Sequence, residues 1–151
     1  MAFVANSVVT SSQLLQMESV QYRITDEVTT DQTIYTALTG DPGGLFVAPM
    51  SGKVWVHISC AMRSDAAGID SACGFELRRG PTVGVGTVIQ AANDDDLLYV
   101  ADNAARTQTG IDCFVAGLTP KAVYNVRLLY KRVGASSIAR FYNRLISVRP
   151  A

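Results

Sequence analysis

The sequence predicts an all-β protein, a jelly-roll-like antiparallel β-sandwich with an extended N-terminal arm, and three observations lead to this prediction. Apolar and polar side chains alternate with a period of two in several segments, as in half-buried strands. Clusters of Gly, Pro, Asp and Asn separate these short segments and favour turns. The chain of 151 residues shows no long helical periodicity. Many short strands joined by such turns are typical of sandwiches and barrels.

The clearest alternation runs over residues 53–60, directly after a turn-forming Pro-Met-Ser-Gly sequence. One face of this strand is apolar and we expect it to point into the core. The other face carries Trp55 and His57, which we expect on the less buried side of the strand or at a contact between subunits. The inward set is Val54, Val56, Ile58 and Cys60, and the outward set is Lys53, Trp55, His57 and Ser59.

The same alternation predicts strands over residues 73–78, 124–131 and 138–148. Neither face of the last strand is wholly polar, so we expect it to be central or covered by a neighbouring subunit, with Arg140 and Arg144 at that contact. Its first face comprises Ile138, Arg140, Tyr142, Arg144, Ile146 and Val148. Weaker strand candidates are Val20–Ile24, Thr33–Leu38, Leu45–Ala48, Thr87–Ala91, Leu97–Ala101 and Thr107–Ala116, and a short helix is expected near Ser11–Ser19.

Residues 1–19 differ from the rest of the chain, because Glu18 is their only charge and Ser, Thr, Val, Gln and Asn dominate. We interpret them as an N-terminal arm that becomes ordered against a partner. Its candidate contact residues are Phe3, Val4, Val8, Val9, Leu14 and Leu15. Residues 20–151 are expected to form a single β-sandwich domain, since no repeat, low-complexity tract or linker divides them.

Composition favours an oligomer. Apolar residues make up 48% of the chain and charged residues only 17%, against about 25% charged in a typical soluble domain. The charge is also unevenly distributed, because residues 121–151 contain seven of the thirteen basic residues and no acid. These basic residues alternate with apolar ones, so we expect them to pair with acidic strands of the same domain or of a neighbour. Nucleic-acid binding is the alternative that we do not favour.

Cys60, Cys73 and Cys113 lack metal or redox spacing, and an odd number does not suggest a disulfide framework. We expect buried free thiols, consistent with folding in a reducing cytoplasm. The N-terminus does not resemble a secretion signal, and no apolar run approaches the ~20 residues of a membrane helix. We therefore expect a soluble protein that is not exported by a standard signal and has no membrane partner.

The sequence offers little catalytic chemistry. His57 is the only histidine and no Gly-x-Ser-x-Gly turn is present, so a packing or interface histidine is the favoured interpretation. One histidine and three dispersed cysteines give no zinc spacing. Residues 93–96, Asn-Asp-Asp-Asp, are expected to form a solvated turn, with calcium at a subunit junction as the alternative. We predict no enzyme activity, no cofactor and no metal.

Three stretches carry a resemblance to a family. They are Leu45–Val56, Gly117–Arg127 and Phe141–Pro150, which contain a Pro-x-Ser-Gly-x-Val strand start, a Gly-Leu-Thr-Pro turn and an Asn-Arg-x-x-x-Val-x-Pro strand. This pattern resembles small β-domains in virion proteins of tailed bacteriophages, particularly those of actinobacteria. The first and last stretches also resemble trimeric jelly rolls of the complement-head and tumour-necrosis-factor type. The family has Gly after the Pro of the turn, where this chain has Lys121.

The resemblance implies a virion structural protein, without catalytic residues, that assembles in the host cytoplasm. A short chain with an adhesive arm fits a capsid decoration, or cement, protein on the capsid surface. Its partners would be two further copies of itself, forming a homo-trimer, and the major capsid protein. The alternative is a minor tail protein or tail appendage that contacts other tail proteins or a receptor on the host surface.

Overall fold

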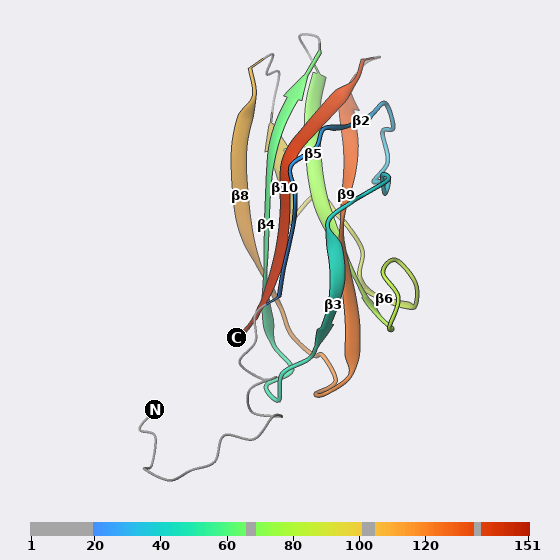
Figure 1. Ribbon diagram of the computed structural model, residues 1–151, viewed down its shortest axis with the longest axis vertical. Helices are drawn as coiled ribbons and strands as arrows, with labels where there is room; N and C mark the ends of the chain where they lie inside the picture. Colours follow the sequence, from blue (N-terminus) through green and yellow to red (C-terminus); the bar gives the residue numbers. More distant parts are fainter. Residues whose placement is uncertain (1–19, 66–68, 101–104, 135–136) are drawn as a thin grey trace, which may run out of the picture.

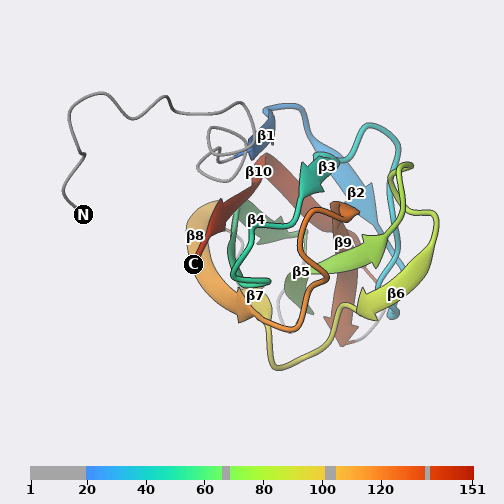
Figure 2. The ribbon, with the colours of Figure 1, turned by 90° about the horizontal axis from the view of Figure 1, so that it is seen from below.

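The computed structural model describes residues 20–151 apart from 66–68, 101–104 and 135–136, and every regular element in these ranges is a β-strand. Long strands run side by side along the molecule (Figure 1). Seen from one end, they form two facing layers (Figure 2). The all-β antiparallel sandwich is therefore confirmed. The arm and the short helix expected near Ser11–Ser19 lie outside the described residues.

The first sheet, sheet A, has the order β1-β10-β4-β8, and β2 also pairs with β10. All of its pairs are antiparallel. Its strands are β1 (Val20–Ile24), β2 (Val28–Thr30), β4 (Val54–Ser64), β8 (Thr107–Val115) and β10 (Ala139–Pro150). In β4 the side chains alternate between the core and the outer surface as the sequence predicts, with Val54, Val56, Ile58 and Cys60 at most 1% exposed.

The second sheet, sheet B, has the order β3-β9-β5-β6, and β7 pairs with β5. Its pairs are also antiparallel. Its strands are β3 (Gly43–Val47), β5 (Ile69–Arg79), β6 (Thr87–Gln90), β7 (Leu97–Val100) and β9 (Val123–Gly134). Ala72, Gly74 and Glu76 on the outer side of β5 are buried along with the inward residues, so segments outside the sheet cover part of this surface.

The core lies between the two sheets and is built from the inward side chains of both. Tyr130 on β9 packs against Phe141 on β10 with ring centroids 4.7 Å apart, which joins the sheets directly. Cys60, Cys73 and Cys113 are all buried free thiols, as predicted. No described residues form a helix long and apolar enough to cross a membrane.

A bulge in β10 interrupts the alternation that the sequence predicts over residues 138–148. The pairing of β10 with β4 shifts register between Tyr142 and Leu145, and Asn143 has a φ of 44°. Ala139 and Phe141 point inward before the bulge, whereas Arg144 points inward after it. The prediction that Arg140 and Arg144 share one face is wrong, because an inserted residue reverses the alternation.

The other predicted strands are close to the observed ones, with one exception. Residues 33–38 do not form a strand, because only Thr36 exchanges backbone hydrogen bonds with Tyr130 and makes an isolated bridge. The sequence also gave no sign of the three-residue strand β2. Segments this short form because a neighbouring strand is available to pair with them. They contain too few residues to show a period of two in the sequence.

The basic residues of the last strands pair within the chain, as expected. Five of them form ion pairs with acidic side chains from earlier segments, which places the two charge-rich parts of the sequence on adjoining strands and loops. The pairs are Arg127–Glu76, Lys131–Asp94, Arg140–Glu27, Arg140–Asp65, Arg144–Asp41 and Arg149–Asp112. Intramolecular pairing therefore explains the position of most of this positive charge.

Candidate functional site

The outer surface of sheet A carries an exposed aromatic pair. Trp55 on β4 and Phe114 on β8 are direct neighbours in the strand register. Their ring centroids are 5.1 Å apart at an interplanar angle of 58°, a tilted packing that aromatic rings favour. The exposed fractions are 36% for Trp55 and 51% for Phe114. We call Trp55, His57, Asp112, Phe114 and Arg149 the aromatic face.

Polar and charged side chains lie beside the two rings in the strand register. His57 Nδ1 lies 3.2 Å from Asp112 Oδ1, and Arg149 Nη2 lies 3.4 Å from the same oxygen. Gly110 makes room for the imidazole, because a Cβ at this position would lie 3.3 Å from His57 Cε1. The predicted outward position of Trp55 and His57 is therefore confirmed. In the described hydrogen bonds the imidazole is paired with a carboxylate and not with a serine hydroxyl.

Arg140 lies on the same outer surface, near the opposite end of β10. Its Nε and Nη2 each lie 2.6 Å from one oxygen of Asp65, and its Nη1 bonds Glu27. A hydrogen bond from Tyr142, together with the Arg140 guanidinium, holds the pKa of Glu27 below its ordinary value. The hydrogen bonds from Arg140 likewise lower the pKa of Asp65. Arg140 is thus saturated with partners from its own chain.

Arg144 does not belong to the surface on which we expected it. Its side chain is 1% exposed and lies between the sheets, paired with Asp41. The β10 bulge causes this, because it turns Arg144 inward and leaves Arg140 outside. The remaining interface candidates, Phe3, Val4, Val8, Val9, Leu14 and Leu15, lie outside the described residues.

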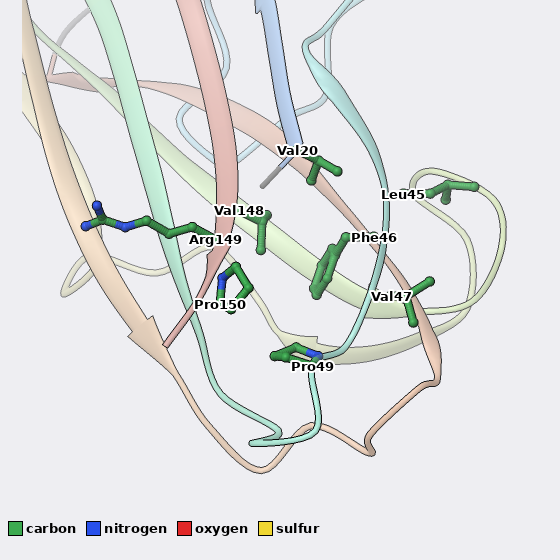
Figure 3. Close-up of a pocket in the computed structure, with 8 residues that line it drawn as sticks. All are labelled: Val20, Leu45, Phe46, Val47, Pro49, Val148, Arg149 and Pro150. Carbon is green, nitrogen blue, oxygen red and sulfur yellow. The ribbon is translucent and has the colours of Figure 1, made fainter. Parts of the chain in front are cut away.

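A small apolar groove lies next to the residue where the described chain begins. Its volume is about 150 Å³. Figure 3 shows Phe46, Pro49 and Val148 around it, with Val20 at one side and the Arg149 side chain directed away. The lining residues are Val20, Leu45, Phe46, Val47, Pro49, Val148, Arg149 and Pro150. The groove therefore adjoins the point at which residues 1–19 join the sandwich.

Residues 93–96 form a hydrogen-bonded turn. Asn93 Oδ1 accepts from the backbone N–H groups of Asp95 and Asp96, and Asp96 Oδ2 accepts from Gln90. Asp94 pairs with Lys131, whose hydrogen bond lowers the pKa of that carboxyl group. Within the described ranges, no group of three His, Cys, Asp or Glu side chains is arranged to hold a metal ion.

Sequence reasoning missed a cluster on the outer surface of sheet B. Tyr35, Asp94, Tyr99 and Lys131 come from four segments and meet beside β5. The two tyrosines lay in weak strand candidates, and the acid lay in a predicted turn. Only the strand register brings them together, so no local pattern could have indicated the cluster.

The three stretches of the family resemblance meet at one end of the sandwich. The Leu118 N–H donates to the Gly52 carbonyl at 3.0 Å, and the Ala151 N–H donates to the Lys53 carbonyl at 3.1 Å. Lys121 has a φ of 62°, in the left-handed region that glycine adopts most readily. The turn thus has the backbone conformation that suits the family's glycine, although a lysine occupies it.

Comparisons with known proteins give similarity at the level of the fold. No protein-family model and no curated protein sequence matches the chain. The VP2 subviral particle of infectious bursal disease virus shares 11% identity with a TM-score of 0.44, over 88% of this chain and 37% of that one. The CBM22-1 xylan-binding domain of Paenibacillus barcinonensis Xyn10C shares 11% identity with a TM-score of 0.42, over 89% and 97%.

A structure of infectious bursal disease virus Gt strain is similar at 11% identity and a TM-score of 0.43, over 86% of this chain and 31% of that one. The chain therefore spans about a third of the length of the viral proteins. At 11% identity and TM-scores below 0.5, these likenesses assign neither a family nor a function.

Proposed function

We propose that this chain is a bacteriophage virion structural protein, a capsid decoration protein that binds the assembled shell as a trimer and stabilises it. It acts by binding, without a catalytic step. The resemblance of three stretches to phage virion β-domains suggests this function. The observation that carries the proposal is the aromatic face of sheet A, for which the described chain provides no cover.

The aromatic face has the composition of a protein contact. Tryptophan and arginine are enriched among the residues that dominate binding energy, and polar groups usually surround the apolar centre. The Trp55–Phe114 pair supplies the centre, and the pairs of Asp112 with His57 and Arg149 supply the rim. We assign this face to the contact between subunits, so each copy buries its exposed rings against a neighbour.

The arm supplies the contact with the shell. Residues 1–19 join the sandwich at Val20, beside the apolar groove, and their single charge allows them to lie along an apolar surface. Three arms on one trimer bind together, so weak individual contacts combine through a high effective concentration. Cyclic symmetry keeps the three contacts equivalent.

Separate variants test the two contacts. Mass measurement of the full chain by light scattering should give three times 16.2 kDa, and Phe114→Ala should shift the mass to that of a monomer. Tyr99→Ala is the matched control, because Tyr99 is 48% exposed on the opposite sheet. A wild-type chain that remains a monomer at all concentrations contradicts the trimer.

Co-sedimentation with shells assembled from the major capsid protein tests decoration. The full chain should bind assembled shells and not free capsid subunits. A chain lacking residues 1–19 should remain trimeric and lose the binding. Full occupancy by the truncated chain excludes the role of the arm. Saturable binding to host cell envelopes, without binding to shells, would support the tail-protein alternative.

A further inference from the structure

The outer surface of sheet B contains a trough formed by one row of three strands. Ala72 on the central strand β5 is the register partner of Tyr99 on β7 and of Lys131 on β9. A methyl group between two long side chains leaves a depression of about 330 Å³, which Asp94, Leu97 and Val133 also line. This size lies within the ~300–1,000 Å³ range of small-molecule sites.

Tyr99 provides an aromatic wall for this trough. The residue is 48% exposed, and its hydroxyl donates a hydrogen bond to Asp70. A tyrosine in this position presents an apolar face with a polar edge. Such a face suits a flat, partly apolar ring that also carries hydrogen-bonding groups.

The opposite wall is polar and is held in place before any ligand binds. Lys131 Nζ lies 2.5 Å from Asp94 Oδ1 and 4.6 Å from the centre of the Tyr35 ring. The Tyr35 hydroxyl donates to the same Asp94 oxygen at 3.0 Å, and its ring rests against Gly74. The Asp94 side chain is nevertheless 68% exposed, so the carboxylate can still accept hydrogen bonds from a ligand.

A second depression of about 340 Å³ adjoins the first. Thr33, Ile34, Tyr35, Ala92 and Asn93 line it, together with the same Asp94 and Lys131. The ion pair therefore belongs to both depressions and can donate and accept hydrogen bonds in each. Two adjacent sites that share one polar pair fit a ligand made of repeating units.

We propose that this trough binds a saccharide, with one pyranose ring stacked on Tyr99 and its hydroxyl groups bound by Asp94 and Lys131. A second sugar unit occupies the adjoining depression. A pyranose has an apolar C–H face for the tyrosine and hydroxyls that both donate to a carboxylate and accept from an ammonium group. This site lies on the sheet opposite the aromatic face and goes beyond the proposed structural function.

Calorimetric titration of the full chain tests the proposal with a defined panel. The probes are the tetrasaccharides of β-1,4-glucose, β-1,4-xylose, β-1,4-mannose, α-1,4-glucose and β-1,4-N-acetylglucosamine, each with its monosaccharide. We expect at least one tetrasaccharide to bind at least about ten-fold more tightly than its monosaccharide, since it fills both depressions. Tyr99→Ala should weaken that binding at least about ten-fold, and Tyr99→Phe should keep it within about three-fold.

Val85→Ala is the control, because it truncates an apolar side chain that is 60% exposed and lines neither depression, so it should leave saccharide affinity unchanged. Circular dichroism establishes that each variant is folded. The proposal is overturned if no tetrasaccharide binds at about 5 mM, a concentration that detects weak complexes, or if Tyr99→Ala binds as well as the wild type. These titrations need no shell, so their failure leaves the decoration proposal untouched.

Discussion

Arg144 Nη1 lies 2.9 Å from Asp41 Oδ1 in the interior of the sandwich, where the two side chains are only 1% and 7% exposed. Arg144 also donates to the Tyr130 hydroxyl at 3.4 Å, and Asp41 accepts from the Leu38 N–H. The pair therefore connects β10 of sheet A with the loop before β3 and with β9 of sheet B. Among the described residues, Arg144 Nε has no hydrogen-bond partner.

Replacing Arg144 by methionine should strongly destabilise the fold, because it leaves the buried Asp41 carboxylate without its cation. Loss of one partner of a buried ion pair costs about 3–5 kcal/mol, whereas an apolar replacement of both partners is often neutral. Arg144→Met should therefore lower the free energy of unfolding by that amount in guanidinium titrations. A double variant, Arg144→Met with Asp41→Leu, should recover most of the loss.

Arg149→Met is the control for this experiment, since Arg149 also lies on β10 and pairs with an aspartate. That pair is solvent-exposed, with fractions of 56% and 46%, and exposed pairs contribute about 0–1 kcal/mol. Equal losses in Arg144→Met and Arg149→Met would contradict the importance of burial.

Asp41 should make stability depend on pH in the acidic range. Burial raises its pKa from 3.8 to about 6, although the Leu38 N–H and the Arg144 guanidinium act in the opposite direction. Between these two values the folded state binds the proton more tightly than the unfolded state does. The contribution of Asp41 to the free energy of unfolding therefore falls as pH rises through this window, and is constant above it.

Unfolding titrations from about pH 3 to about pH 7 can isolate this contribution, because that interval spans both pKa values. The free energy of wild type minus that of Asp41→Asn should decrease as pH rises to about 6 and then level off. This subtraction cancels the contributions of the other carboxyl groups to the free energy of unfolding, because they are common to both proteins. Parallel curves for the two proteins would show that Asp41 titrates alike in both states.

A methyl group on Gly44 should separate the two edge strands β1 and β3. Its Cβ would lie 1.9 Å from Tyr22 Cζ, so the tyrosine must move and lose its 2.8 Å hydrogen bond to the Leu45 carbonyl. Gly44→Ala should lower the free energy of unfolding by about 1–3 kcal/mol, the usual cost of overpacking. Thermal or chemical denaturation measures the loss.

Tyr22→Ala provides the matched background, because it removes the obstructing ring. Gly44→Ala should then add little further loss, which a double-mutant cycle records as coupling. Gly43→Ala should cost the same stability with or without Tyr22→Ala. Its Cβ would lie 2.7 Å from the Val126 carbonyl oxygen, which belongs to the backbone and is not removed by that variant. Equal costs of Gly44→Ala in both backgrounds would disprove the contact.

Lys121→Gly should stabilise the turn before β9. Lys121 has a φ of 62°, and the left-handed conformation costs a residue with a Cβ about 1–2 kcal/mol. Glycine avoids this cost but loses more entropy on folding, so we expect a net gain of about 0.5–1 kcal/mol in the free energy of unfolding.

Asn143→Gly is the comparison for that substitution. Asn143 also has a positive φ, of 44°, but asparagine tolerates this region because its side chain can hydrogen-bond locally. Its replacement should therefore gain less stability than Lys121→Gly. The reverse order in denaturation midpoints would contradict the assignment of strain to Lys121.

The alternation of apolar and polar residues by itself predicted most of the strands of this protein. It located the strands around β4 and the exposed positions of Trp55 and His57, because a period of two reports directly which side of a strand meets water. The interleaving of basic and apolar residues predicted that the last strands pair with acids of the same domain or of a neighbour, and the structure shows pairs within the chain. These properties arise from residues close together in sequence.

Only the tertiary structure decided where Arg144 and Tyr99 lie. A single inserted residue reverses the facing of every side chain after it, so the bulge at Tyr142–Leu145 buries an arginine that alternation places with Arg140. The trough depends on the register that sets Tyr99 and Lys131 on either side of Ala72. The packing of the whole sandwich fixes the register between distant strands, so a local sequence pattern does not predict it.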